Sequence, residues 1–412
     1  MPVHSETATQ AGLLITEFSL KLFPTVILPS AESSTTMSAT KDLSTPQTET
    51  LAAFLSARIR RDGPITFRDW MEAALYHPTE GYYCRRDRKR WGREGDYRTS
   101  PERSDLFAAT FARYFAVLYE KLDRPSDWTI VEIGAGDGQF ARGVMGTLRN
   151  SVPYVFAATQ YVIDETSADS RERARRQVAS FGNQVQFETL SNLDQISPGI
   201  VFSNELLDAF PVHRVTKKKG RLLEFYVIVT PDERFSWSLG PLSTTLLSDY
   251  FRESEMDLAE NQIVEINLAV DEWLAQTARK LAAGYLVTVD YGAELKELYN
   301  SPEHDQGTLR SYHRHRPSDD VLERPGEQDI TTTIDWTHVK RAGDKLGFEV
   351  IEFTPQDKFL MREGLLEELA RQSNIATRDA DRLRLSTSAR EMILPGGMSS
   401  SFQVLVQRRF TT

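Results

Sequence analysis

The sequence predicts an α/β protein built on a doubly wound, mostly parallel sheet. From Trp128 onward, short apolar runs alternate with helical stretches, which is the pattern of parallel strands joined by crossover helices. One of these runs, 130–133, leads directly into a glycine-rich turn and then into a helix. That order is typical of sheets that bind a nucleotide at the carboxyl ends of their strands.

Composition restricts the kinds of protein to consider. The chain has 412 residues, of which 40% are hydrophobic and 26% charged, so it can bury a sizeable core. Its net charge of -10 argues against nucleic acid or an anionic membrane surface as a partner. The single cysteine, Cys84, cannot form an internal disulfide. No stretch approaches the roughly 20 apolar residues of a membrane span, so we expect none.

We divide the chain into four parts. The first contains 17 Ser or Thr and no Arg, a composition that favours a disordered leader. The second contains three expected helices, over 51–60, over 67–76 and along an apolar stripe from Phe107 to Leu118. The boundaries are 1–50 for the leader, 51–125 for an N-terminal helical cover and loop, 126–295 for the core of the sheet, and 296–412 for a C-terminal part that completes the sheet.

The segment 81–103 of the second part is basic and loop-like. It carries eight basic side chains with four aromatic ones between them. Such a segment can grip a single strand of nucleic acid. The acidic balance of the whole chain instead favours a solvated loop or a lid over a ligand.

Apolar runs locate the expected strands of the core. Five of them form the parallel set: Thr129–Ile133, Tyr161–Ile163, Val185–Phe187, Ile200–Ser203 and Tyr285–Val289. Two later runs, Phe348–Ile351 and Phe402–Val406, are expected to pair antiparallel at the edge of the sheet.

An insertion at about 212–275 separates the last two parallel strands. It opens with a hairpin of Val212–Thr216 and Leu222–Val229 that turns at Lys219–Gly220. It continues into helical sequence, whose last helix is expected over Gln262–Ala283 because apolar residues there recur on one face. The predicted architecture is therefore a doubly wound sheet with an N-terminal helical cover and an inserted hairpin and helix unit.

The glycine turn has the spacing G-x-G-x-G at Gly134, Gly136 and Gly138. Glycines there let the backbone bend sharply and approach a ligand without a Cβ in the way. The dinucleotide pattern G-x-G-x-x-G is not met, because Gln139 stands where its last glycine belongs. Glu132 completes the pattern E-x-G-x-G-x-G of class I S-adenosylmethionine-dependent methyltransferases. We therefore expect the cofactor to contact Glu132, the three glycines and Ala135.

A second acidic residue is expected at the end of the next strand, because a carboxylate can accept hydrogen bonds from both ribose hydroxyls of a cofactor. The sequence offers two neighbours there, Asp164 and Glu165. We favour Glu165, and Asp164 remains the alternative.

The fourth strand runs into a polar, acidic turn that contains Asn204, Glu205 and Asp208. This turn falls at the carboxyl edge of the sheet, where ligands bind in such folds. Carboxylates at that edge can hold a guanidinium and direct its nucleophilic nitrogen. We therefore predict Asn204, Glu205 and Asp208 as the catalytic set. The alternative is that Asn204 and Glu205 only cap the start of a helix.

Together these motifs resemble one family, the class I methyltransferases that include the mitochondrial complex I assembly-factor arginine methyltransferase and its bacterial relatives. The resemblance covers roughly Leu51–Val406. Besides the glycine turn, it rests on seven ordered segments: Gly63–Phe67, His77–Tyr83, Gly95–Glu102, Ser203–Pro211, Asp290–Gly292, Gly307–His315 and Pro325–Thr331.

The resemblance implies methyl transfer from S-adenosylmethionine to an accessible arginine of a protein partner, of the respiratory complex I subunit type. It also implies that Asp96, Thr99 and Ser100 face the cofactor or the substrate. The alternative in another class is a non-catalytic assembly factor that binds S-adenosylmethionine. We expect no metal, because His313 and His315 lack the cysteines and paired carboxylate of a zinc site.

The resemblance also bears on location. An arginine-free leader is unlike a mitochondrial transit peptide. We therefore expect a bacterial cytoplasm, with the mitochondrial matrix as the alternative.

Overall fold

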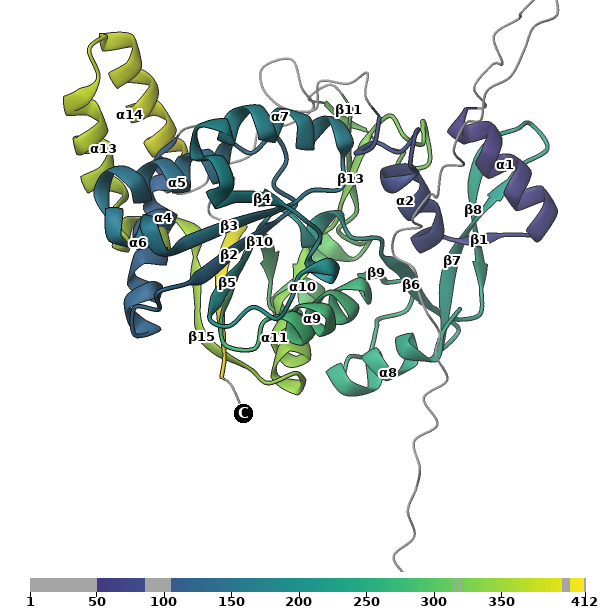
Figure 1. Cartoon of the computed structure of the whole chain (residues 1–412). Helices are drawn as coiled ribbons and strands as arrows, with labels where there is room; N and C mark the ends of the chain where they lie inside the picture. Colours follow the sequence, from purple (N-terminus) through teal and green to yellow (C-terminus); the bar gives the residue numbers. More distant parts are fainter. Residues whose placement is uncertain (1–49, 86–104, 314–315, 319, 395–400, 411–412) are drawn as a thin grey trace, which may run out of the picture. The chain divides into compact units, whose positions relative to one another are not determined.

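The structure is a computed structural model that describes residues 50–85, 105–313, 316–318, 320–394 and 401–410 (Figure 1). The predicted leader up to residue 49 lies outside the described residues. So do Asp96, Thr99 and Ser100, the three candidates taken from the resemblance. The boundaries of the four parts stay a prediction.

The main sheet has the strand order β15-β16-β10-β5-β2-β3-β4, and β14 pairs with the end of β10. The strands β10, β5, β2, β3 and β4 run parallel, whereas β16 runs antiparallel to both β10 and β15. The predicted fold class is confirmed. The bounds are β2 Trp128–Ile133, β3 Thr159–Asp164, β4 Val185–Phe187, β5 Gly199–Asn204, β10 Gly284–Ala293, β14 Ile334–Asp335, β15 Phe348–Pro355 and β16 Phe402–Arg409.

The order of the strands places a ligand site. The chain moves outward from β2 to β3 and β4, and then returns to β5 on the other side of β2. Such a reversal leaves a crevice at the carboxyl ends of the two central strands, where ligands bind in open α/β sheets. Both predicted site segments, the glycine turn after β2 and the acidic turn after β5, begin at these ends.

Helices cover both faces of this sheet, which explains why consecutive residues at the centres of its strands are apolar and buried (Figure 1). Ile130 of β2 packs in a cluster with side chains of α4 and α5, whereas the next residue, Val131, packs with side chains of α9 and α11. The helices are α1 Leu51–Asp62, α2 Phe67–Tyr76, α4 Asp105–Lys121, α5 Gln139–Ser151, α6 Pro153–Ala158, α7 Ala168–Val178, α8 Thr245–Ser254, α9 Ala269–Lys280, α10 Leu295–Asn300, α11 Trp336–Lys345, α12 Gln356–Arg362, α13 Leu365–Ile375 and α14 Asp379–Ile393.

A second, antiparallel sheet is formed largely by the insertion. Its order is β1-β7-β6-β9, and β8 also pairs with β7. The predicted hairpin is confirmed, because β6 and β7 pair antiparallel. The cover helices α1 and α2 pack on this sheet against Val227. The bounds are β1 Ile65–Thr66, β6 His213–Lys218, β7 Arg221–Val229, β8 Phe235–Gly240 and β9 Ile263–Ile266.

The helix expected over Gln262–Ala283 is wrong before Ala269 and after Lys280. Residues Ile263–Ile266 form β9, which pairs with β6 so that Ile266 lies opposite His213. The helix α9 begins only at Ala269 and ends at Lys280. The apolar spacing that suggested a helix also fits a strand of branched side chains, and the pairing with β6 decides between them.

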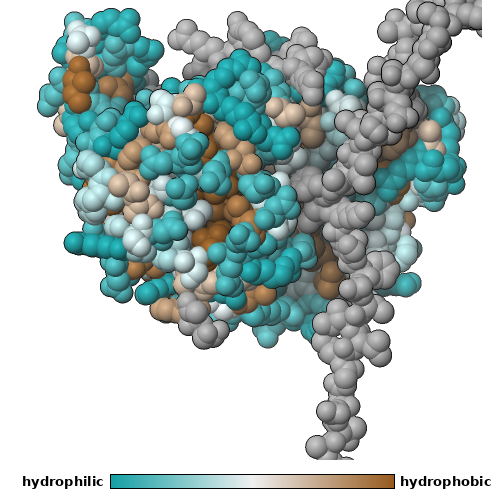
Figure 2. Space-filling model, in the orientation of Figure 1, coloured by the Kyte–Doolittle hydropathy of each residue, from teal (hydrophilic) through white to brown (hydrophobic). Residues whose placement is uncertain are grey.

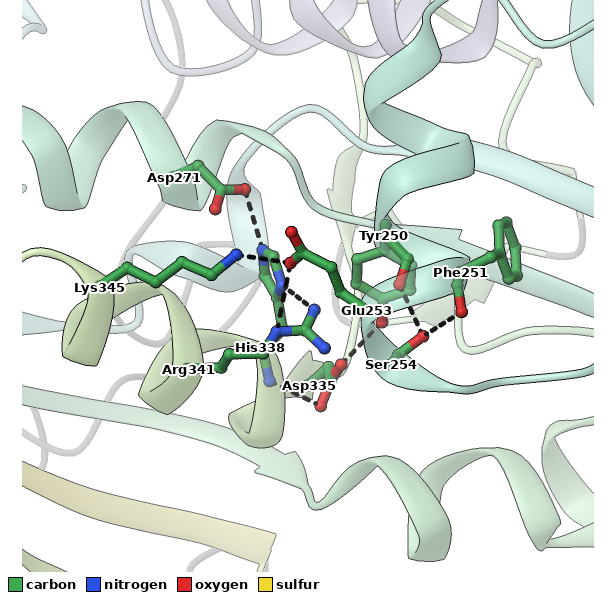
Figure 3. A network of polar contacts seen from close by, with 9 residues as sticks. All are labelled: Tyr250, Phe251, Glu253, Ser254, Asp271, Asp335, His338, Arg341 and Lys345. Atoms are coloured by element: carbon green, nitrogen blue, oxygen red, sulfur yellow. Dashed lines mark hydrogen bonds and ion pairs between the residues drawn. The ribbon is translucent and has the colours of Figure 1, made fainter. Parts of the chain in front are cut away.

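Polar contacts join the insertion to the helices below the sheet (Figure 3). Tyr250 of α8 donates a 2.7 Å hydrogen bond to Oδ2 of Asp335, whose Oδ1 caps α11. His338 of α11 contacts Asp271 of α9 through Nε2 at 2.9 Å. Glu253 of α8 contacts Lys345 at 2.6 Å. These contacts link α8 to α11 and α9 to α11.

The remaining strands form a small sheet in the order β12-β11-β13, with β11 Arg310–His313, β12 Arg316–Ser318 and β13 Asp329–Thr331. In the view of Figure 2 most of the surface is hydrophilic, with an apolar spot over α13 and α14 at the upper left. Exposed apolar side chains of these helices include Leu366, Ile375 and Leu383. Within the described ranges, no helix is both long and apolar enough to cross a membrane.

Candidate active site

The glycine turn connects β2 to α5 and needs its glycines. Gly134, Gly136 and Gly138 have φ values of +72°, +56° and +81°, which lie in the left-handed region. A β-carbon on Gly138 would also lie 2.8 Å from Cβ of Ala174 in α7. Between these glycines, Ala135 is buried. The turn therefore presents its backbone, rather than side chains, toward the carboxyl edge of the sheet.

Glu132 lies inside the sheet beneath this turn. Its side chain is buried, and the hydroxyl of Tyr161 donates a 2.7 Å hydrogen bond to its Oε2. Burial raises the pKa of Glu132 to about 8, although the Tyr161 hydrogen bond acts in the opposite direction. Glu132 is therefore mostly neutral at pH 7. It lies in β2, two residues before the first glycine of the turn.

The two acidic candidates at the end of β3 have different partners. Glu165 accepts hydrogen bonds from the backbone amides of Gly136, at 2.8 Å, and Ser167, at 2.7 Å. Asp164 instead accepts from the amide of Leu190, at 2.8 Å, beyond β4. Burial raises the pKa of Asp164 to about 6. The carboxylate of Glu165 is thus bonded to the glycine turn, whereas the carboxylate of Asp164 is bonded to a neighbouring loop. The backbone carbonyl of Asp164 accepts from the amide of Gly134 at 2.8 Å.

The acidic turn after β5 is held by Asp290, at the carboxyl end of the adjacent strand β10. Oδ2 of Asp290 accepts from the amides of Leu206, Leu207 and Asp208 at 3.2, 2.9 and 3.3 Å. Glu205, just before them, has a φ of +51°, an uncommon value for a residue with a side chain. Nδ2 of Asn204 donates to Oε1 of Glu205 at 3.0 Å. The three residues predicted as catalytic therefore lie on one anchored turn.

Three further segments contact the backbone carbonyls of this turn. The hydroxyl of Tyr76 in α2 donates to Ala209 at 3.0 Å, and the amide of Thr332 donates to Asp208 at 2.9 Å. Nδ2 of Asn267, which follows β9 in the insertion, donates to Leu207 at 2.9 Å. No pattern in the sequence marked these residues for the site. They belong to no local motif, and only the fold brings them to the turn.

The turn is strongly acidic. Asp208 is 5% exposed, and burial together with the charge of Glu205 raises its pKa to about 7. Burial and the charge of Asp208 raise the pKa of Asp290 well above its usual range. The pKa of Tyr76 is also raised well above its usual value, by burial and then by the charges of Asp208, Asp329 and Glu165, among others. This environment favours a positively charged ligand.

The glycine turn and the acidic turn touch each other. A β-carbon built on Gly134 would lie 3.0 Å from Cδ1 of Leu206, which is part of the acidic turn. The charges of Asp208 and Glu165 both contribute to raising the pKa of Tyr76, after the larger effect of burial. A cofactor held by the glycine turn and an acceptor held by the acidic turn would therefore be neighbours.

The residues present fit a nucleoside cofactor with a ribose. The three left-handed glycines leave the backbone open to a ligand. Glu165 places a carboxylate, the group that can accept from two ribose hydroxyls, next to the amide of Gly136 in this turn. With this strand order and the glycine pattern, these features define the class I S-adenosylmethionine-dependent methyltransferases.

Comparison with known proteins agrees with this class. The family model described as "Putative S-adenosyl-L-methionine-dependent methyltransferase" matches residues 110–354, more than half of the chain. The chain belongs to this family, and it is an S-adenosylmethionine-dependent methyltransferase.

Two relatives carry the name "Protein arginine methyltransferase NDUFAF7" and are named mitochondrial. The Caenorhabditis elegans homolog is 26% identical over 348 residues, which cover 79% of this chain and 79% of the relative. The Danio rerio protein is 26% identical over 387 residues, which cover 85% and 84%. A Burkholderia thailandensis crystal structure with bound S-adenosyl-homocysteine has a TM-score of 0.78 and 29% identity. The structural alignment covers 87% of this chain and 92% of the Burkholderia chain.

Proposed function

We propose that this methyltransferase transfers the methyl group of S-adenosylmethionine to an arginine side chain of a protein partner. The observation that carries the proposal is the contact between the acidic turn and the glycine turn, through Leu206 and Gly134. This closeness supports an anionic acceptor site beside the cofactor site. The names of the relatives support arginine as the acceptor.

On the cofactor side, we assign contacts to the backbone of Gly134, Ala135, Gly136 and Gly138, and to the carboxylate of Glu165 as the ribose ligand. Glu132 supports these contacts from beneath, and Asp164 remains the alternative ribose ligand. When bound, the cofactor supplies a methyl group on a positively charged sulfur, which is already a reactive donor. The protein therefore contributes mainly by positioning.

On the acceptor side, Glu205 and Asp208 hold the guanidinium, and Asn204 orients Glu205 through their 3.0 Å hydrogen bond. Methylation of a guanidinium releases one proton. Asp208 is suited to accept it, because its pKa of about 7 lies close to neutral pH. The carboxylate form of Asp208 is therefore the active form in this proposal.

The partner class that the family resemblance implies is a subunit of respiratory complex I. For location we retain the bacterial cytoplasm, while the eukaryotic relatives are named mitochondrial.

Two measurements on the full chain test the proposal. Calorimetric titration with S-adenosylmethionine should show binding that Gly136→Val abolishes, because valine does not adopt the φ of +56° found there. Thermal unfolding of that variant controls for misfolding.

Methyl transfer to a pool of arginine-containing peptides should then exceed transfer to the same pool with lysine in place of arginine. Glu205→Gln should keep cofactor binding and lose most of the transfer. Cofactor binding without transfer to any arginine acceptor would favour the non-catalytic assembly factor instead.

A further inference from the structure

Three buried amide or carboxylate oxygen atoms around the acidic turn lack a hydrogen-bond partner among the residues that the structure describes. They are Oδ1 of Asn204, Oδ1 of Asp208 and Oδ1 of Asn267. Asn204 precedes the turn, Asp208 lies within it, and Asn267 bonds to the carbonyl of Leu207 at its centre. A buried acceptor without a donor costs about 1–3 kcal/mol. Three such atoms at or beside one short turn therefore call for an explanation.

The orientation of the two amides makes these atoms informative. Nδ2 of Asn204 is used by Glu205, and Nδ2 of Asn267 is used by the carbonyl of Leu207. Each Nδ2 thus has a partner inside the protein, whereas the oxygen of each amide has none. In these three side chains the atoms left without any partner are acceptors, and one of them belongs to a carboxylate.

Other buried polar atoms without partners differ from this group. Gln407 has both amide atoms unpaired, so its surroundings do not select either a donor or an acceptor ligand. Thr216 of β6 has a single unpaired hydroxyl, which can donate as well as accept. Gln160 of β3 and Asp357 of α12 each have one unpaired acceptor oxygen. What distinguishes the acidic turn is that three acceptor oxygens occur at it or beside it.

We propose that Asn267 is an acceptor-binding residue, whose Oδ1 receives N–H groups of the substrate guanidinium together with Oδ1 of Asn204 and Oδ1 of Asp208. A guanidinium has five N–H donors in one plane and no acceptor, so it can serve several acceptors that approach from different directions. The proposal rests on the proposed function and extends it. The inserted unit, which supplies Asn267, takes part in choosing the side chain that is methylated.

The test is calorimetric titration of the full chain with the peptide acetyl-Gly-Arg-Gly-amide at saturating S-adenosyl-homocysteine. The citrulline counterpart serves as the second probe, because it replaces one guanidinium nitrogen with a carbonyl oxygen and is neutral. Three variants are compared with wild type. Asn267→Ala removes both amide atoms, Asn267→Asp keeps oxygen acceptors but removes the donor to Leu207, and Thr216→Val removes an unrelated unpaired hydroxyl.

We expect Asn267→Ala to weaken arginine-peptide binding about 10- to 100-fold, the usual effect of losing a hydrogen bond to a charged group. Its preference for arginine over citrulline should fall as well. Asn267→Asp should stay within a few fold of wild type, and Thr216→Val should be unchanged. S-adenosyl-homocysteine affinity should be the same in all four proteins.

The outcomes separate two kinds of failure. If Asn267→Asp is as weak as Asn267→Ala, Asn267 acts only by supporting Leu207, and the inference is overturned. Wild-type binding by Asn267→Ala, or no arginine-peptide binding by wild type, also overturns it. If instead the peptide binds through Asn267 but receives no methyl group in the presence of S-adenosylmethionine, the inference stands and the proposed function fails.

Discussion

The backbone amide of Gly136 donates a 2.8 Å hydrogen bond to Oε2 of Glu165. This bond ties the acidic residue that follows β3 to the centre of the glycine turn after β2. Asp164, one residue earlier, bonds to Leu190 instead. Both neighbouring carboxylates are candidates for the ribose ligand. In the fold they have different hydrogen-bond partners, and only the carboxylate of Glu165 bonds to the glycine turn.

Glu165→Gln should weaken S-adenosylmethionine binding about tenfold or more, because the charge that strengthens hydrogen bonds to Gly136 and to the ribose is lost. Asp164→Asn is the matched control and should change the affinity less than threefold. Calorimetric titration of both variants checks this. A larger loss in Asp164→Asn would transfer the ribose role to Asp164.

Gly138→Ala should destabilise the protein by about 1–3 kcal/mol, since it combines a φ of +81° with a clash against Ala174. A β-carbon added to Gly146, which lies within α5, would meet no atom of another element within 4 Å. Gly146→Ala should therefore stabilise by about 0.5–1 kcal/mol. Urea unfolding measures both, and equal effects would refute the packing argument.

Asp290→Ala should lower the free energy of unfolding by about 2–4 kcal/mol, because three amides of the acidic turn lose their acceptor. Asp290→Asn should cost less, because an amide oxygen still accepts and the raised pKa of Asp290 shows that the neutral form is favoured. The measurement is chemical unfolding at pH 7. If Asp290→Ala leaves the free energy of unfolding unchanged, the acidic turn is held by its other contacts.

Stability should fall as the pH rises toward 8, through Glu132. Its folded pKa of about 8 lies above the usual value of 4.5, so between these values the native state binds more protons than the unfolded state. The free energy of unfolding therefore decreases as the pH rises from about 4.5 to about 8, and Glu132 causes no further change above that range. Glu132→Gln should flatten the slope in unfolding measured from pH 5 to pH 9. If the slope does not change, the pH dependence of stability comes from other groups, and Asp208, whose pKa is raised to about 7, is the next one to test.

Local signals predicted the strands of the sheet well. In β2, β3, β4, β5 and β10, the apolar run, the turn residues and the following helix all lie close together in the chain. The residues that form the sequence pattern are therefore the same ones that form the strand and its turn. The failure at Ile263–Ile266 has the opposite cause. That segment is a strand because β6, some 50 residues away, supplies its hydrogen-bond partners.

By itself, the sequence determined the cofactor class and the two turns that form the site, because the glycine spacing and the acidic motif are local constraints on backbone conformation and charge. The tertiary structure alone decided which carboxylate joins the glycine turn. It also decided that Asp290, Asn267 and Tyr76 converge on the acidic turn. Those contacts join residues far apart in the chain, and their partners are chosen by how the two sheets and α2 pack, which no short stretch of sequence records.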